Sequence, residues 1–387
     1  MEDPSESPPP LKTYKLTATS ISYTKSTITK PSFSSLFFTP CTTTPPTYIL
    51  KDISLTALPS QILAVVGPSG AGKSTLLDIL AARTLPSHGT LLLNSAPLVP
   101  STFRKLSSYV PQHDHCLPLL TVSETFLFAA KLLKPKTSNL AATVSSLLSE
   151  LRLTHLSNTR LARGLSGGER RRVSIGLSLL HDPAVLLLDE PTSGLDSTSA
   201  FKVMQILKQT CTTRNRTIIL SIHQPSFKIL ACIDRILLLS KGTVVHHGSV
   251  ATLHAFLHSN GFTVPHQLNA LEYAMEILCQ LNEVKPVTPP SIPESPESSI
   301  STSSVSEGGA RSSREIIRYR SSRVHEIFTL YSRFWKIIYR TRQLLMTNTA
   351  EALLVGLVLG TIYINIGFDK EGIEKRFGLF AFTLTFL

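Results

Sequence analysis

The chain has 387 residues, of which 42% are hydrophobic. This supports one large domain with appendages or two ordinary domains, and it excludes disorder throughout. The cysteines are odd in number and none lies in a CxxC pair, which disfavours a disulfide framework and a zinc site: Cys41, Cys116, Cys211, Cys232 and Cys279. The formal net charge is +12, and the acidic, Pro-rich start Met1–Pro4 lacks the apolar segment of a signal peptide.

The N-terminal part predicts two strands separated by an insertion. Leu16–Tyr23 and Ile49–Leu55 alternate between apolar and polar residues, as half-buried strands do. Residues 24–46, rich in Thr, Ser and Pro, are predicted to form an inserted loop.

A P-loop follows the next predicted strand, Ile62–Val66. Its glycines let backbone N–H groups turn toward phosphates, Lys73 supplies a positive charge to the β- and γ-phosphates, and Ser74 offers a hydroxyl to Mg²⁺. The strand before it and the helix predicted from Lys73 are the context that this motif requires. The predicted ATP-binding residues are Gly67, Pro68, Ser69, Gly70, Ala71, Gly72, Lys73, Ser74 and Thr75.

A helical segment and a second anion-binding motif come next. Residues 121–160 carry apolar side chains at helical spacing, and about 121–180 is predicted to be a helical subdomain. Leu165–Arg170 then opens an apolar helix containing several arginines, so its N–H groups form an anion site. Because one ATP already has the P-loop, this site is predicted to contact the ATP of a second chain, through Ser166, Gly167, Gly168 and Glu169.

Val185–Leu188 is predicted to be a buried parallel strand that ends at two acidic residues. Asp189 is placed to hold Mg²⁺, and Glu190 to orient or deprotonate the attacking water. Pro191–Asp196 extends this acidic motif, which disfavours a simple strand cap.

Together these motifs resemble the ATPase of ATP-binding cassette (ABC) transporters over nearly the whole chain. The resemblance implies an α/β P-loop fold over residues 1–284 and assigns three further roles. Gln112 would sense the γ-phosphate and contact Mg²⁺, Asp196 would belong to the D-loop, and His223 would be the switch histidine. The adenine-stacking aromatic would be Tyr23 or Tyr14, although core tyrosines fit equally well.

Within that family the chain resembles the G subfamily of half-transporters. The ATPase precedes the membrane segment, Gly167–Arg170 reads Gly-Gly-Glu-Arg, and His223–Ser226 reads His-Gln-Pro-Ser. Gln267–Glu276 resembles a plant branch whose members export lipids, waxes or hormones.

The C-terminal part is predicted to meet a membrane. After a flexible linker, 285–313, residues 314–342 are predicted to form an amphipathic connecting helix on the membrane surface. Nine basic residues lie between Arg311 and Arg342, and their position before an apolar stretch favours the cytoplasmic flank of a membrane helix over a nucleic-acid site. Within the predicted membrane segment 343–387, residues 344–366 are long enough to span a hydrocarbon core of ~30 Å. The last eleven residues are too short for a second span, so a truncated chain is expected.

The leading hypothesis is an ATP- and Mg²⁺-dependent half-transporter subunit. It would pair with a second subunit, as a homo- or heterodimer, in the plasma membrane with its ATPase domain in the cytoplasm. Its substrate would be a small hydrophobic or amphipathic molecule or a lipid, and no nucleic acid is expected. Two alternatives remain open: a truncated regulatory subunit that inactivates its partners, and a soluble ABC ATPase outside transport.

Overall fold

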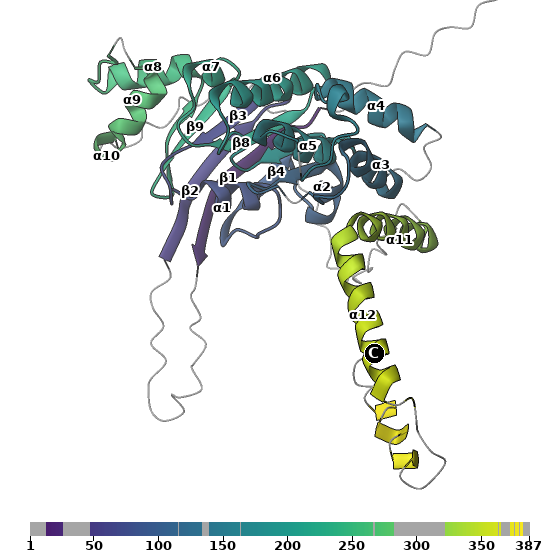
Figure 1. Ribbon diagram of the computed structural model, residues 1–387. Helices are drawn as coiled ribbons and strands as arrows, with labels where there is room; N and C mark the ends of the chain where they lie inside the picture. Colours follow the sequence, from purple (N-terminus) through teal and green to yellow (C-terminus); the bar gives the residue numbers. More distant parts are fainter. Residues whose placement is uncertain are drawn as a thin grey trace, which may run out of the picture. The chain divides into compact units, whose positions relative to one another are not determined.

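In the computed structural model, the chain divides into two compact units, Met1–Arg320 and Ser321–Leu387, which are described separately (Figure 1). The structure describes residues 13–25, 47–114, 116–133, 139–162, 164–265, 268–281 and 322–362, with residues 364, 372–374, 376–378 and 380–381. The predicted linker, 285–313, and most of the predicted loop, 24–46, lie outside these ranges.

The larger sheet of the first unit has six strands in the order β10-β9-β3-β8-β7-β6. All neighbouring strands are parallel except β9 and β10. β3 and β7 are the apolar runs that the sequence predicts as buried strands, and every residue in them is buried. The strands are β3 (Ile62–Val66), β6 (Ser107–Val110), β7 (Val185–Leu188), β8 (Thr217–Ile222), β9 (Arg235–Ser240) and β10 (Thr243–Gly248).

Both faces of this sheet are covered (Figure 1). Alternate β3 residues face different cores: Ile62, Ala64 and Val66 belong to one cluster, and Leu63 and Val65 to the other. The first core includes helices α5, α6 and α8, and the second includes α1 and the smaller sheet. Because both faces are covered, a ligand can reach this sheet only at the ends of its strands. The helices are α1 (Lys73–Leu80), α2 (Pro100–Leu106), α5 (Gly167–Leu179), α6 (Ser197–Thr213), α7 (Phe227–Leu230), α8 (Val250–Ser259), α9 (Ala270–Glu276) and α10 (Leu278–Leu281).

The smaller sheet is antiparallel, in the order β2-β1-β4-β5. β1 extends through Lys25, which pairs with Thr47, so Thr24 and Lys25 belong to a strand and not to the predicted loop. The strand gains cross-strand pairs by continuing through these two residues. The strands of the smaller sheet are β1 (Leu16–Lys25), β2 (Thr47–Ala57), β4 (His88–Leu93) and β5 (Ala96–Pro97).

The predicted helical segment contains α3 (Val122–Leu133), α4 (Leu140–Glu150) and the short 3-10 helix η1 (Thr154–Leu156). α3 ends two residues before Pro135, whose ring is incompatible with a continuing helix. A glycine lets α5 pack closely against this segment. A Cβ on Gly176 would lie 2.4 Å from Leu151 Cδ1 and 2.7 Å from Phe126 Cζ.

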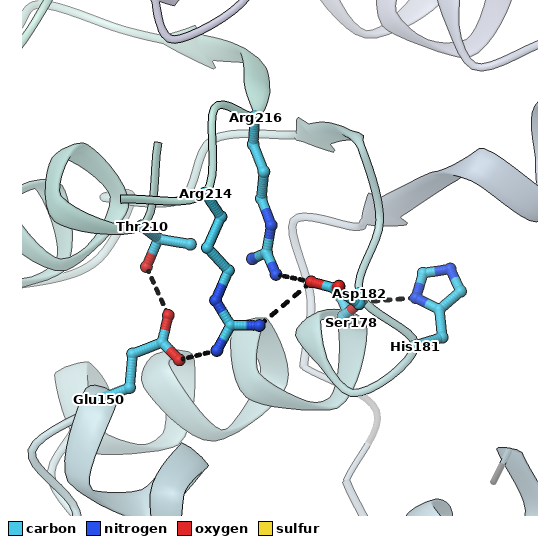
Figure 2. Close-up of polar contacts among 7 residues, drawn as sticks. All are labelled: Glu150, Ser178, His181, Asp182, Thr210, Arg214 and Arg216. Carbon is cyan, nitrogen blue, oxygen red and sulfur yellow. Dashed lines mark hydrogen bonds and ion pairs between the residues drawn. The ribbon is translucent and has the colours of Figure 1, made fainter. Parts of the chain in front are cut away.

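A charge cluster, made of Glu150, Asp182, Arg214 and Arg216, joins α4 to the turns that precede β7 and β8 (Figure 2). Arg214 donates to Glu150 Oε2 at 3.0 Å and to Asp182 Oδ1 at 3.1 Å, and Arg216 also donates to Asp182. These turns lie at the amino ends of β7 and β8, whereas the acidic pair Asp189 and Glu190 follows the carboxyl end of β7. The charge cluster and the acidic pair therefore lie at opposite ends of the strands.

The second unit contains two long helices, α11 (Arg323–Arg340) and α12 (Arg342–Ile362). α11 lies within the amphipathic helix predicted over 314–342, of which residues 314–321 lie outside the described ranges. Its aromatic and aliphatic side chains are largely exposed. Among the described residues no single helix has the length and hydropathy needed to cross a membrane. α11 and Leu345–Thr361 meet that requirement only as a pair bent by 75°. The span predicted over 344–366 runs past α12 into residues outside the described ranges, so it stays a prediction.

Candidate active site

The P-loop connects the carboxyl end of β3 to the start of α1. Gly70 and Gly72 have φ angles of 78° and 98°, which only glycine adopts readily. Gly67 passes so close to β9 that a Cβ there would lie 2.2 Å from the Leu239 carbonyl oxygen. The glycines therefore serve the shape of the loop, as the motif requires.

Lys73 lies inside this loop with only 6% of its surface exposed. Its Nζ donates to the carbonyl oxygens of Gly67 at 2.9 Å and Pro68 at 3.1 Å. Burial lowers the pKa of Lys73, whereas the negative charges of Glu190 and Asp189 act to raise it. The cation is thus held beside two acidic residues.

Asp189 directly follows β7 and is held by three hydroxyl groups. Ser221 donates to Asp189 Oδ1 at 2.6 Å, Ser74 donates to the same oxygen at 3.2 Å, and Tyr109 donates to Oδ2 at 3.4 Å. Burial and the charge of Asp189 raise the pKa of Tyr109, so its phenol stays a donor. The structure therefore brings together two of the three predicted metal-binding residues, Ser74 and Asp189, whereas the third, Gln112, donates to Glu190.

Glu190 adopts a φ of 42°, which is uncommon for a residue with a side chain. Its backbone N–H donates to Ser221 Oγ at 2.8 Å, and its Oε2 accepts from Gln112 Nε2 at 2.9 Å. Two of the predicted catalytic residues are thus in direct contact. The third, His223, lines a cavity of about 420 Å³ with Glu190 but without Gln112. The other residues that line this cavity are Ser69, Thr192, Ser193 and Gly194.

The predicted second anion site lies at the N-terminus of α5. Ser166 and Glu169 form a capping box: Ser166 Oγ accepts from the Glu169 N–H at 3.3 Å, and Glu169 Oε2 accepts from the Ser166 N–H at 2.8 Å. That second hydrogen bond also lowers the pKa of Glu169. The Ser166 N–H is thereby bonded within the chain, and the predicted contact of Ser166 with a partner's ATP stays a prediction. The N–H groups of Gly167 and Gly168 remain in the first turn, where a helix has no partners of its own for them.

The start of α5 lines a second cavity, of about 310 Å³, which differs from the cavity lined by Ser69 of the P-loop. Gly167 lines it with Gln112 and Leu195, and Ser193 and Gly194 line both cavities.

The other predicted positions have structural partners. Asp196 is the N-cap of α6: it accepts from the Ser199 N–H at 3.0 Å and from the Thr198 hydroxyl, and these bonds hold the pKa of Asp196 well below its ordinary range. Tyr14 and Tyr23 both pack against the core beneath the smaller sheet, which favours the alternative of core tyrosines.

Sequence reasoning missed two residues that organise the site. Arg171, on α5 and 4% exposed, donates to the carbonyl oxygens of Gln112 at 3.1 Å and Asp189 at 2.8 Å, and to Asp114 Oδ1 at 3.0 Å. Ser221 contacts both acidic residues. The arginine-rich start of α5 was a visible signal for Arg171, whereas a lone Ser in an apolar strand gave none for Ser221.

The donor set fits a nucleotide-bound divalent cation better than a metal held by protein alone. The described residues contain no group of three His, Cys, Asp or Glu side chains able to hold a metal. One hydroxyl and one carboxylate, Ser74 and Asp189, are what Mg²⁺ uses when phosphate and water oxygens complete its coordination.

Comparison with known proteins identifies the family. Residues 50–193 match the ABC transporter family, and residues 223–296 and 325–387 match two ABC-2 type transporter families. ABC transporter G family member 8 of Arabidopsis thaliana is 65% identical over 387 residues, which is all of this chain and 63% of that protein. Member 4 of the same plant is 63% identical over 379 residues, 97% of this chain and 63% of that protein.

A relative from another plant agrees over a shorter region. ABC transporter G family member STR of Petunia hybrida is 44% identical over 245 residues, covering 61% of this chain and 29% of that protein. The chain thus spans about 63% of the length of the two Arabidopsis relatives. The predicted α/β P-loop fold and the predicted subfamily are confirmed. The chain belongs to the G family of ABC transporters, a family of ATPases, and combines its ATP-binding domain with ABC-2 type membrane sequence.

Proposed function

We propose that this chain is the ATP-hydrolysing subunit of a half-transporter, in which two subunits pair head to tail and each completes the ATP site of the other. The observation that carries the proposal is that two anion-binding elements line two different cavities. Ser69 and Glu190 line the first, whereas Gly167 at the N-terminus of α5 lines the second. One ATP needs only the P-loop site, so the second element is available to the nucleotide of a partner.

The residues of the first cavity support in-line phosphoryl transfer. Lys73 would contact the β- and γ-phosphates, and Ser74, Asp189 and Gln112 would hold Mg²⁺. When bound, Mg²⁺ neutralises charge on the transferred phosphoryl group. Glu190, fixed by the Gln112 amide at 2.9 Å, would orient the attacking water and accept its proton.

The remaining parts of the proposal concern the membrane. The ABC-2 type match over residues 325–387 and the exposed apolar side chains of α11 support insertion in a membrane, with the ATPase domain on the cytoplasmic side of the plasma membrane. A hydrophobic or amphipathic molecule is the proposed substrate. The membrane match disfavours a soluble, non-transport ATPase. Retention of the protein in the pellet after an alkaline carbonate wash would exclude that alternative.

Trans complementation tests the pairing. In a version that carries the whole membrane domain of its relatives, Lys73→Ala damages the P-loop and Ser166→Arg blocks the start of α5, so each homodimer has two damaged sites. A mixed dimer has one intact composite site and one doubly damaged site. Random pairing of equal amounts should therefore restore about a quarter of the parent ATPase activity.

Two results give this test its controls. Lys73→Ala alone should abolish ATP hydrolysis, and Glu190→Gln should bind ATP without turnover and trap a closed dimer. If crosslinking shows mixed dimers but mixing restores no activity, the shared-site proposal is wrong unless both sites must act together. A crosslink from residue 166 to nucleotide bound by the partner separates these two outcomes. The regulatory alternative instead predicts that the 387-residue chain lowers the activity of co-expressed longer subunits.

A further inference from the structure

Ser221 contacts both acidic residues of the site without reaching the cavity itself. It is the penultimate residue of β8, with 0% of its surface exposed. Its hydroxyl donates to Asp189 Oδ1 at 2.6 Å and accepts the Glu190 N–H at 2.8 Å. One buried hydroxyl thus uses its donor on one acidic residue and an acceptor site on the next.

The two hydrogen bonds have different consequences for the two residues. The bond to Asp189 occupies the oxygen that Ser74 also contacts, at 3.2 Å, so it sets the rotation of the carboxylate beside the Ser74 hydroxyl. The bond from Glu190 holds its N–H while the backbone adopts a φ of 42°. Residues with side chains avoid this region, so a specific backbone partner is needed to maintain it.

We propose that Ser221 is a positioning residue for the ATPase reaction, fixing the Asp189 carboxylate for Mg²⁺ and the Glu190 side chain for water. This rests on the proposed function. Without the hydroxyl, Asp189 would rotate more freely and bind Mg²⁺ less well, and Glu190 would lose the turn that presents its carboxylate to the cavity. The P-loop contacts of Lys73 do not involve Ser221, so binding of Mg²⁺-free ATP should not change.

Nucleotide binding provides a readout that does not depend on turnover or pairing. The 387-residue protein, in detergent, is titrated with a fluorescent ATP analogue in EDTA and then with increasing Mg²⁺. Ser221→Ala should leave the affinity in EDTA unchanged and raise the Mg²⁺ concentration needed for half-maximal enhancement roughly 10-fold or more, since a hydrogen bond to a charged group is lost. Mn²⁺ binding in the presence of ATP, followed by electron paramagnetic resonance, should weaken in parallel.

Three further variants make the result specific. Ser221→Thr keeps a hydroxyl on a residue that strands favour, and it should restore the Mg²⁺ dependence. Ser221→Cys keeps a similar volume with only a weak donor and should behave like Ser221→Ala. Ser107→Ala is the matched control, because this buried Ser on β6 donates only to the Phe103 carbonyl oxygen, at 2.9 Å. It should bind Mg²⁺ and ATP as the parent does.

In the version that hydrolyses ATP, Ser221→Ala should lower kcat roughly 10- to 100-fold with little change in KM. A folded Ser221→Ala protein with the parent's Mg²⁺ dependence would overturn the inference, as would an equal loss of affinity with and without Mg²⁺. A parent protein that binds no nucleotide, or whose binding survives Lys73→Ala unchanged, would instead refute the proposed function, and this inference with it.

Discussion

The charge cluster in Figure 2 predicts that one ion pair will give very different stability losses depending on which partner is removed. The side chain of Arg216 is 2% exposed, whereas that of its partner Asp182 is 59% exposed. Asp182→Ala leaves a buried guanidinium without an ionic partner, and the Arg216 Nη1 already lacks a hydrogen-bond partner within the described part of the chain. Arg216→Met removes the buried charge, fills a similar space, and leaves Asp182 in water beside Arg214.

Asp182→Ala should therefore lower the free energy of unfolding by about 2 kcal/mol. Breaking a fully buried pair costs about 3–5 kcal/mol, and access of water to the Asp182 side of this pair reduces that value. Arg216→Met should cost about 1 kcal/mol or less, because a well-packed apolar replacement of a buried ion is close to neutral. Glu150→Ala should also cost about 0.5 kcal/mol, since its partner Arg214 is 42% exposed.

Thermal unfolding of the purified protein checks the order of these losses. A difference of 1 kcal/mol corresponds to a Tm shift of about 2–4 °C for a domain of this size class, so Asp182→Ala should unfold several degrees below Arg216→Met. In the double variant, Arg216→Met should remove most of the penalty of Asp182→Ala. The reasoning fails if Arg216→Met is as destabilising as Asp182→Ala, or if the two losses simply add.

Three further predictions concern other parts of the first unit. Burial, and secondarily Arg235, lowers the pKa of His247 to about 4, below its unfolded value near 6.5. Its stabilising contribution is therefore complete above pH 6.5 and is lost as the pH falls toward 4, so urea unfolding of His247→Gln should show a weaker loss of stability over that range than the parent. Gly176→Val should lower the free energy of unfolding by about 2 kcal/mol, because the new side chain meets Leu151 and Phe126; an unchanged Tm would contradict that packing. Gln112→Ala should lower kcat by roughly tenfold through loss of its bond to Glu190, and normal turnover would show that Glu190 is held by other groups.

Much of the site was predictable because its residues lie in continuous motifs. The apolar runs of β3 and β7, the glycines of the P-loop and the acidic pair after β7 each carry their own local requirement, so position in the sequence gives position at the sheet edge. Contacts between motifs were not predictable in the same way. Ser221 meets Asp189 only because β8 is the neighbour of β7, and strand order is not visible in either segment.

The differences at element ends have equally local causes. β1 continues through Thr24 and Lys25 because β2 offers pairing partners, although both residues begin a stretch whose Thr, Ser and Pro content is typical of a loop. At the start of α5, the Ser166 N–H donates to the Glu169 carboxylate in a capping box, so the N–H groups of Gly167 and Gly168 are the ones left for the predicted anion site. Propensity and motif spacing predict that a helix starts at this position. They do not predict which of its first backbone N–H groups form hydrogen bonds within the chain.

Neighbouring arginines connect α5 to two other parts of the first unit. Arg171 donates to the carbonyl oxygens of Gln112 and Asp189, and Arg172 donates to those of Leu151 and Arg152, the two residues that follow α4. Under the proposed head-to-tail pairing, the start of the same helix touches the partner's nucleotide. Arrival of that nucleotide would then reach the Gln112 loop directly through α5, without waiting for any change in the chain's own P-loop. Nucleotide binding at one ATP site of a dimer would in this way affect the Gln112 loop of the other site before ATP is hydrolysed at either.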